Sequence, residues 1–389
     1  MKYYSHLQTA VQLIELYRGN QPFGDYAKEF FRANKKYGST DRRQILQLCY
    51  AVFRTGRAFS GLPLNERILI GLFLSSQEPN VLLENLQPEW NEKVTSSMEE
   101  KLAICSGELT MIFPWKDELS AGIDHEEYCQ SFFVQPDLFL RIRPGYEGMV
   151  KNKLEQAGIS FRTINENCLA LPNASKADQV IETNKEAVVQ DLNSQRVAEL
   201  IKKAGGYHEI NNIWDCCAGS GGKSIMAFDA MNHIKLTVSD IRATMLHNLE
   251  QRFNSAGIKS YNAFAADIAA NDFDPQKYFS SKTKFDLILA DVPCTGSGTW
   301  SRTPEHLSYF RTKQIEEYAL VQKSIVDNVI PQLLPGGAFL YITCSVFKKE
   351  NEEQVKHIQQ KHGLKLQQVE LLKGYDQKAD TLFAALFTS

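Results

Sequence analysis

The first third of the chain places its apolar residues at the spacing of amphipathic helices. The stretch DRRQILQLCYAVFRTGR (41–57) repeats an apolar position every three or four residues, and LNERILIGLFL (64–74) continues the pattern. This period turns one face of each helix toward a shared core. We therefore predict an all-helical domain over residues 1–125.

The pattern then becomes mixed. DLFLRIRPG (137–145) alternates apolar and polar residues like a strand, EGMVKNKLEQAGI (147–159) has the helical period, and ISFRTI (159–164) and CLALP (168–172) are short strand-like runs. Short strands that alternate with one helix are typical of a small module in which the helix packs on a sheet. We predict a small α+β subdomain over residues 131–185.

From residue 186 onward, strand and helix patterns alternate regularly. The predicted helices begin near Lys223, near Arg242 and near residue 312, and the predicted strands are NNIWDCC (211–217), IKLTVSD (234–240), YNAFAAD (261–267), FDLILAD (285–291) and GGAFLYITC (336–344). Such alternation is typical of a doubly wound α/β fold with a parallel sheet, which binds its ligands at the carboxyl ends of the strands. We predict a Rossmann-like domain over residues 186–389.

Composition narrows the class of protein. The chain has 389 residues, of which 43% are hydrophobic and 23% charged, and it contains no run of 18 uncharged apolar residues. Its eight cysteines form no CxxC pair and its eight histidines show no ligand spacing. We expect a cytoplasmic protein with free thiols and with no metal and no membrane partner, and the oligomeric state stays open.

The charge is unevenly distributed. Residues 1–60 carry ten Lys and Arg against four Asp and Glu, whereas residues 61–130 carry four against thirteen. A basic face of this kind can contact the phosphates of a nucleic acid. A solvated helix surface explains the same charges, so both interpretations remain open.

A glycine-rich segment, DCCAGSGGKS (215–224), follows the first predicted strand of the Rossmann-like domain and opens a helix. A triphosphate-binding loop needs a glycine six positions before its lysine, and that position is Cys217, so a P-loop fits poorly. Gly219, Gly221 and Gly222 allow backbone N–H groups to approach a ligand closely. Close packing of the turn is the alternative explanation.

Acidic residues end the next three predicted strands. They are Asp240, Asp267 and Asp291. A carboxylate at the second strand end commonly accepts hydrogen bonds from ribose hydroxyls, although any one of the three residues could instead cap a helix. Because these strand ends meet at the same edge of the sheet as the glycine-rich loop, the four segments together predict a site for an adenosine-bearing cofactor.

Two cysteines are expected at the same edge. Cys294 follows the strand that ends at Asp291, and Cys344 ends the next strand, whereas Cys49 and Cys105 lie in apolar helical patterns typical of a core. A thiolate is an effective nucleophile near neutral pH and also a good leaving group. Two thiols beside a carboxylate and a cofactor site therefore indicate covalent chemistry.

Several separated motifs resemble those of the RsmB/Fmu (Sun)/NSUN family of RNA cytosine-C5 methyltransferases. The motifs are VVQDLNSQRVAEL (188–200), DCCAGSGGKS (215–224), DVPCTGSGTWSRTPE (291–305) and YITCSVFKKENEEQV (341–355). The segment FRANKKYGSTDRRQILQLCYAVFR (31–54) is also similar to the NusB-like RNA-binding module found in the bacterial RsmB group. This second likeness favours RNA contact by the basic N-terminal face.

The resemblance implies S-adenosylmethionine as cofactor and assigns roles to individual residues. Asp240 would bind the ribose, Asp267 the adenine, and Asp291 would lie beside the reacting methyl group and the base. Cys344 would be the nucleophile that adds to carbon 6 of cytosine, and Cys294 would assist product release. The methionine part would be surrounded by Cys217, Ala218, Gly219, Ser220, Gly221, Gly222 and Lys223.

Alternatives to this assignment remain. DNA cytosine methyltransferases use a proline-cysteine nucleophile, so Cys294 after Pro293 is a rival to Cys344. The expected substrate is 16S ribosomal RNA, with unpaired cytosines favoured because a stacked base must be flipped out of its helix at a cost of a few kcal/mol. A tRNA cytosine-C5 methyltransferase and a non-catalytic RNA-binding ribosome assembly factor are the competing functions.

The sequence departs from the family pattern at three places. Ser220 stands where the family usually has proline, which we expect to loosen the turn slightly without removing a backbone donor. Asp380–Phe383 reads DTLF in place of a DGFF-type segment, and the connector over residues 113–139 differs from the usual one. The last two differences bear on how the base is seated and which RNA is chosen.

Overall fold

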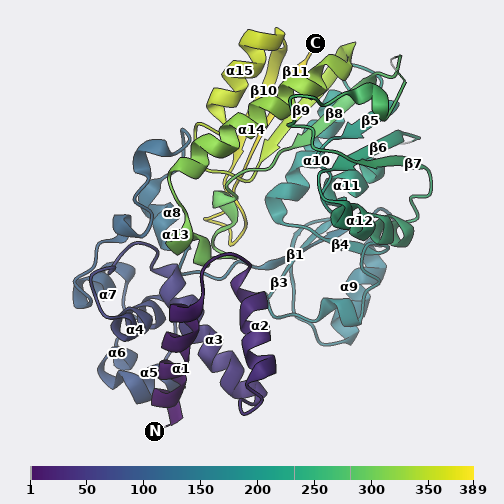
Figure 1. The fold of residues 1–389 in the computed structure, drawn as a ribbon. Coiled ribbons are helices and arrows are strands. Elements are labelled where there is room, and N and C mark those ends of the chain that lie inside the picture. Colours follow the sequence, from purple (N-terminus) through teal and green to yellow (C-terminus); the bar gives the residue numbers. More distant parts are fainter. Residues whose placement is uncertain (1, 232, 281) are drawn as a thin grey trace. The chain divides into compact units, whose positions relative to one another are not determined.

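The computed structural model describes residues 2–231, 233–280 and 282–389 (Figure 1). Contacts divide the chain into two compact units. The helical unit contains the residues up to Leu119, Ile123–Gln135 and Thr299–Arg311, and the sheet unit contains Ser120–Gly122, Pro136–Gly298 and Thr312–Ser389. The division into domains at 1–125, 131–185 and 186–389 stays a prediction.

The helical unit packs short amphipathic helices around an aromatic core that includes Phe23, Phe53 and Phe73. Burying each such side chain contributes roughly 1.5–3 kcal/mol. Among the described residues, no helix combines the length and apolar character needed to cross a membrane. The α-helices are α1 (Lys2–Leu16), α2 (Phe23–Ala33), α3 (Ser39–Arg54), α4 (Leu64–Ser75), α5 (Val81–Leu86), α6 (Pro88–Glu92), α7 (Met98–Ile104), α8 (His125–Ser131) and α13 (Glu305–Tyr309), and the 3₁₀ turns are Leu109–Ile112 and Lys116–Glu118.

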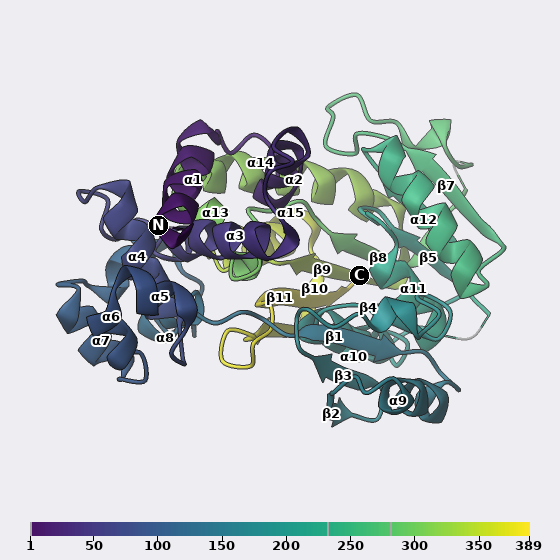
Figure 2. The same ribbon diagram turned by 90° about the horizontal axis from the view of Figure 1, so that it is seen from below.

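The sheet unit contains a small antiparallel sheet with strand order β2-β3-β1-β4 (Figure 2). Its apolar side chains pack against Val150 and Leu154 of one helix, α9 (Glu147–Gln156), which gives the module its own core. The strands are β1 (Leu138–Ile142), β2 (Arg162–Asn165), β3 (Cys168–Leu171) and β4 (Ala187–Val189), with a 3₁₀ turn at Ala177–Gln179. The strands and helix predicted for this part of the sequence are present.

The second sheet of the unit has seven strands among the described residues, in the order β10-β11-β9-β8-β5-β6-β7. Neighbours from β9 to β7 are parallel, as predicted, but β11 runs antiparallel to both β9 and β10. A short connection can join β10 directly to β11 because antiparallel neighbours need no helical crossover. The strands are β5 (Asn212–Asp215), β6 (Lys235–Asp240), β7 (Tyr261–Ala265), β8 (Phe285–Asp291), β9 (Leu333–Thr343), β10 (Lys365–Leu372) and β11 (Leu382–Thr388).

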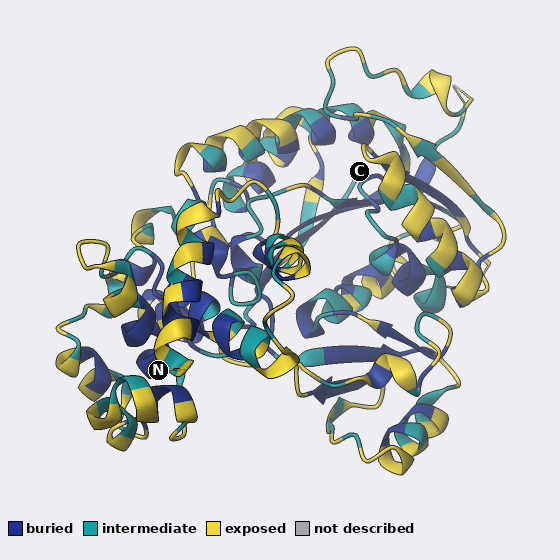
Figure 3. Ribbon diagram, turned by 60° about the horizontal axis from the view of Figure 1, so that its bottom comes forward, coloured by how far each residue is buried: buried dark blue, intermediate teal, exposed yellow. Residues whose placement is uncertain are grey.

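Helices cover both faces of this sheet, so its central strands are buried on both sides (Figure 3). Along β8, Leu287 and Leu289 face one core, and Ile288 and Ala290 face the other. The first core is closed by α10 (Leu192–Ala204), α11 (Gly222–Ala230) and α12 (Ala243–Ala256), and the second by α14 (Lys313–Val329) and α15 (Glu352–His362). The remaining 3₁₀ turns are Pro275–Lys277, Ser297–Thr299 and Ile330–Gln332.

A buried ionic cluster joins the small sheet to the large one. Asp229, in α11, accepts hydrogen bonds from Arg141 Nη1 at 2.6 Å and from Arg143 Nη2 at 2.7 Å. The three side chains are only 8–10% exposed. Charge-assisted hydrogen bonds fix both guanidinium groups on one buried carboxylate, so this contact holds the small sheet in a defined orientation.

Candidate active site

A cavity of about 570 Å³ lies at the carboxyl ends of the parallel strands. Of the residues predicted to form a site, six line this cavity: Cys217, Asp240, Asp267, Asp291, Cys294 and Cys344. Within the described part of the chain, the lining does not include the other predicted loop residues, Ala218, Gly219, Ser220, Gly221, Gly222 and Lys223. The cavity is large enough for a cofactor of nucleotide size.

The two predicted cysteines meet inside this cavity. Sγ of Cys294 lies 3.4 Å from Sγ of Cys344, and both side chains are partly accessible. The hydrogen bond to Cys344, burial, and the negative charges of Cys344 and Glu350 raise the pKa of Cys294 well above its ordinary value. Cys294 therefore keeps its proton near neutral pH, and the two sulfur atoms are close enough to share a hydrogen bond.

Asp291 forms an ion pair with Lys223. Lys223 Nζ donates to Asp291 Oδ2 at 2.6 Å. Burial opposes the charge of Lys223, but the attraction and hydrogen bond of Asp291, together with the charges of Cys344 and Asp215, outweigh it and raise the pKa of the amine. Lys223 thus stays protonated and fixes the position of the Asp291 carboxylate, although it does not line the cavity itself.

The glycines of the loop serve different purposes. Gly219 has φ +53° with open space where a side chain would lie, and its N–H donates to Asp240 Oδ2 at 3.0 Å. Gly221 has φ +83°, and a Cβ there would approach Phe253 to 2.8 Å and Leu249 to 3.0 Å. At Gly221 the turn therefore needs glycine for packing against α12, which was the alternative explanation for the cluster.

Ser220, in the place of the family's proline, ties the loop to α12. Its Oγ accepts a hydrogen bond from Arg252 Nη1 at 2.6 Å, and its carbonyl accepts another from the same atom at 3.1 Å. Proline has no side-chain acceptor and could make only the second bond. The serine thus supplies an anchoring contact that the expectation of a looser turn did not include.

The acids at the ends of β6 and β7 make local contacts. Asp240 is buried, and its Oδ1 accepts from the N–H and Nε of Arg242 at 2.9 and 3.0 Å. Asp267 is exposed, and its Oδ1 accepts from the N–H of Ala269 at 3.0 Å, as a capping residue does. Both side chains also line the cavity, so the local contact and the cofactor contact are compatible.

Glu350, which the sequence did not single out, joins the two cysteine segments. Its buried carboxylate accepts from Thr295 N at 2.9 Å, Thr295 Oγ1 at 2.7 Å and Ser345 Oγ at 2.7 Å, and Gln322 Nε2 donates to it at 3.0 Å. Thr295 and Ser345 directly follow the two cysteines. Burial raises the pKa of Glu350 despite these hydrogen bonds. The sequence around Glu350, KKENEEQV, has only the charged pattern that is typical of the solvent-exposed start of a helix.

Asp215 is a second residue that the sequence reasoning passed over. It ends β5 and is fully buried, and its Oδ2 accepts from Ser224 Oγ at 2.6 Å. Burial raises its pKa to about 7, with the Asp291 charge adding to the shift and Ser224 and Lys223 opposing it. The strand-end reasoning applied to Asp240 would have found it, since Asp215 stands at the equivalent position of the preceding strand.

The Asp380–Phe383 segment packs directly against the Cys294 loop. Gly298 N donates to the carbonyl of Cys344 at 2.8 Å, and Thr381 N donates to the carbonyl of Gly298 at 2.9 Å. A Cβ on Gly298 would lie 2.0 Å from the Thr381 carbonyl oxygen, so only glycine fits there. The altered C-terminal segment therefore supports the loop through its backbone.

Comparison with known proteins agrees with this geometry. Residues 206–384 match the family model described as 16S rRNA methyltransferase RsmB/F. This segment is therefore similar to RsmB/F methyltransferases. Ribosomal RNA small subunit methyltransferase B of Cronobacter sakazakii is 32% identical over 168 residues, and that of Erwinia tasmaniensis is 32% identical over 175 residues. These matches cover 43% and 45% of this chain but only 37% and 38% of the relatives, so they compare a part of each protein rather than whole proteins.

Solved structures extend the likeness of fold beyond residues 206–384. A crystal structure described as that of PH0851 covers 100% of this chain and 98% of its own, with a TM-score of 0.71 and 17% identity. NSun6 from Pyrococcus horikoshii, solved with SFG, covers 68% of this chain and 94% of its own, with a TM-score of 0.55 and 15% identity. The NusB-like character of the N-terminal helices stays a prediction.

Proposed function

We propose that this protein methylates carbon 5 of cytosine in RNA, with S-adenosylmethionine as methyl donor and 16S ribosomal RNA as the substrate. The observation that carries the proposal is the 3.4 Å separation of the Cys294 and Cys344 sulfurs in a cavity that Asp291 also lines. Carbon 5 of cytosine is too electron-poor to take a methyl group unaided. A nucleophile added at carbon 6 removes this obstacle.

The cavity suits the cofactor. Ile241 and Ile268 offer apolar surfaces for an adenine, Asp240 and Asp267 offer carboxylate oxygens for the ribose and the ring amine, and Cys217 lies where the glycine-rich loop reaches the cavity. When bound, S-adenosylmethionine supplies a methyl group carried on a positively charged sulfur. The ion pair of Asp291 with Lys223 places a carboxylate beside the same cavity.

Cys344 is the residue that we assign as nucleophile. The raised pKa of Cys294 disfavours the thiolate form that a nucleophile needs, which argues against the rival assignment to Cys294. The Sγ–C6 bond forms as the C5–C6 double bond opens, and carbon 5 gains the electron density that methylation requires. Asp291, held by Lys223, would accept a hydrogen bond from the exocyclic amine of the base, and the positive charge of Lys223 would offset the negative charge that spreads to N3.

Release of the product needs a base, and we assign this role to Cys294. Two of the causes that raise its pKa are the hydrogen bond and the charge of Cys344. Both disappear once the Cys344 sulfur is bonded to carbon 6, so Cys294 can then give its proton to water and, as a thiolate, accept the proton on carbon 5. The C5–H electron pair restores the C5–C6 double bond, and Cys344 leaves as a thiolate.

Contact with RNA outside the cavity is assigned to the basic N-terminal region. Arg54 is buried and donates to Gln135 Oε1 at 2.6 Å, so it serves the helical unit itself. The exposed basic side chains around α2 and the start of α3 include Lys28, Arg32, Lys35, Lys36 and Arg43. Exposed cations of this number suit phosphates, whose binding weakens as salt rises.

Bisulfite sequencing of total RNA from a strain lacking the gene tests the proposal. We expect the loss of one or more 5-methylcytosines in 16S ribosomal RNA and their return with the native gene but not with a Cys344→Ala version. If 5-methylcytosine were lost only from tRNA, the substrate would be tRNA rather than 16S ribosomal RNA. An unchanged pattern of 5-methylcytosine would identify a binding protein without methyltransferase activity.

A further inference from the structure

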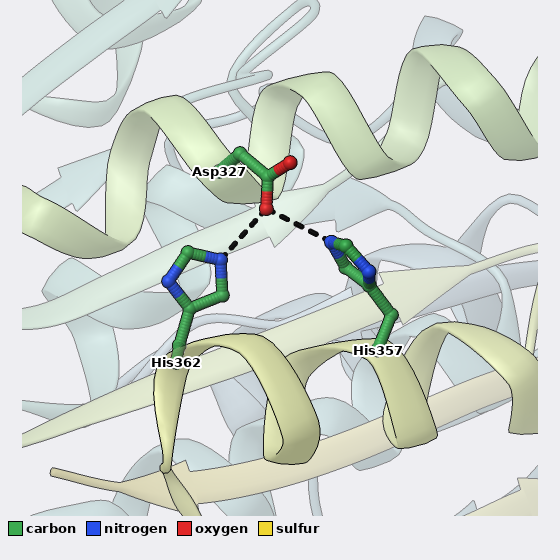
Figure 4. Close-up of side chains that lie close together, drawn as sticks. All are labelled: Asp327, His357 and His362. Atoms are coloured by element: carbon green, nitrogen blue, oxygen red, sulfur yellow. Dashed lines mark hydrogen bonds and ion pairs between the residues drawn. The ribbon is translucent and has the colours of Figure 1, made fainter.

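Outside the cavity, the structure gathers two imidazoles and one carboxylate from two neighbouring helices (Figure 4). Asp327 belongs to α14, His357 to α15, and His362 is the last residue of α15. One potential ligand atom from each residue lies within 4.8 Å of the other two. Sequence spacing does not reveal this group because Asp327 is thirty residues from His357.

The three side chains converge on a single point. Nε2 of His357 and Nε2 of His362 lie 2.8 and 2.7 Å from the same carboxylate oxygen, Asp327 Oδ1. In a tetrahedral zinc site, Zn–N and Zn–O distances of about 2.0–2.2 Å put neighbouring ligand atoms roughly 3.4 Å apart. Separating each imidazole from the carboxylate by roughly 0.6 Å would therefore admit the ion.

The electrostatic surroundings keep the carboxylate available. Lys361 Nζ contacts Oδ2 at 2.8 Å and leaves Oδ1 to the two imidazoles. The side chains are 12–23% exposed, so water can reach the fourth position.

From this geometry we infer that Asp327, His357 and His362 bind one Zn²⁺, which clamps α14 to α15. None of the three lines the active-site cavity, so the inference does not depend on the proposed function. The clamp nevertheless concerns helices that shape the site. Tyr318 and Ile325 of α14 line the cavity, and α15 begins two residues after Glu350.

Calorimetric titration of the tag-free full-length chain with Zn²⁺ alone tests this site. We expect one Zn²⁺ per chain, a thermal midpoint that rises with Zn²⁺ concentration, and a loss of affinity of more than about tenfold in His357→Ala, His362→Ala and Asp327→Asn. His247→Ala, which removes an imidazole that is 68% exposed, is the matched control and should bind like the native chain.

The close thiol pair of Cys294 and Cys344 is a competing zinc site that the experiment must separate. Co²⁺ bound to nitrogen and oxygen lacks the sulfur-to-metal charge-transfer band that thiolate ligands produce. Binding that survives in a Cys294→Ser, Cys344→Ser chain and shows no such band supports the proposal. Binding that survives in the histidine variants, or no stoichiometric Zn²⁺ binding in the native chain, overturns it.

Discussion

The sulfur atoms of Cys294 and Cys344 lie 3.4 Å apart although fifty residues separate them in the chain. Strands β8 and β9 are adjacent and parallel, so both cysteines emerge at the same edge of the sheet. Burial and the contact with Cys344 raise the pKa of Cys294, which disfavours Cys294 as the nucleophile.

Replacing either cysteine should stop turnover at a different step. In Cys294→Ala, we expect a covalent RNA–protein adduct to accumulate because the nucleophile adds but the carbon 5 proton is not removed. Cys344→Ala should form no adduct. Denaturing gel electrophoresis with labelled RNA and S-adenosylmethionine measures both, with Cys105→Ala as a control that behaves like the native chain. An adduct in Cys344→Ala would make Cys294 the nucleophile.

Lys223→Gln should slow methylation by roughly 10- to 100-fold. The variant removes a charge-assisted hydrogen bond to Asp291 worth about 1.5–3 kcal/mol, and the carboxylate loses its fixed position. Single-turnover methyl transfer gives the rate, and circular dichroism checks the fold. Lys223→Arg, which keeps the charge, should recover part of the activity. Native rates in Lys223→Gln would show that the ion pair is dispensable.

Glu350→Gln should weaken the contact between the segments that follow Cys294 and Cys344. The glutamine amide would direct N–H groups at Thr295 and Gln322, which already donate to this position, and each buried group left without a partner costs about 1–3 kcal/mol. We expect a lower thermal midpoint and slower adduct formation. Glu317→Gln, on the exposed face of α14, is the matched control and should change neither quantity. Equal midpoints for the two variants would contradict this role.

The buried acid Asp215 should make stability depend on pH. Its pKa is about 7 in the folded chain against an ordinary value of 3.8. Between these values the folded state keeps a proton that the unfolded state loses, so the unfolding free energy falls as pH rises through this window.

Asp215→Asn removes this titration. Relative to the native chain, the variant should gain roughly 3 kcal/mol of unfolding free energy between about pH 5 and pH 8, since each unit of pKa shift corresponds to about 1.4 kcal/mol. Urea unfolding at several pH values measures the difference. If the unfolding free energies of the native chain and of Asp215→Asn changed equally with pH, Asp215 would be ionised in the folded chain over the whole range.

Asp229→Ala should cost about 3–5 kcal/mol of unfolding free energy, because it leaves Arg141 and Arg143 as buried charges without their carboxylate. Urea unfolding checks this value. Asp376→Ala, at an exposed position, serves as the control and should lie within about 0.5 kcal/mol of the native chain. A similarly small change in Asp229→Ala would mean that the cluster does not hold the small sheet.

The sequence determined the order of strands and helices and the residues at the ends of the parallel strands. Local periodicity marks each strand, and parallel neighbours bring their carboxyl ends to one edge, so the meeting of Asp291, Cys294 and Cys344 at one cavity follows from the pattern. The glycine-rich loop was likewise recognisable because positive φ angles favour glycine.

Only the tertiary structure decided which distant side chains become partners. Glu350 bridges the segments after Cys294 and Cys344, Lys223 pairs with Asp291, and Asp327 meets His357 and His362. These contacts depend on how helices lie across the sheet and on which face each side chain takes. Periodicity along the chain identifies elements, but the directions of single hydrogen bonds between them are settled by packing.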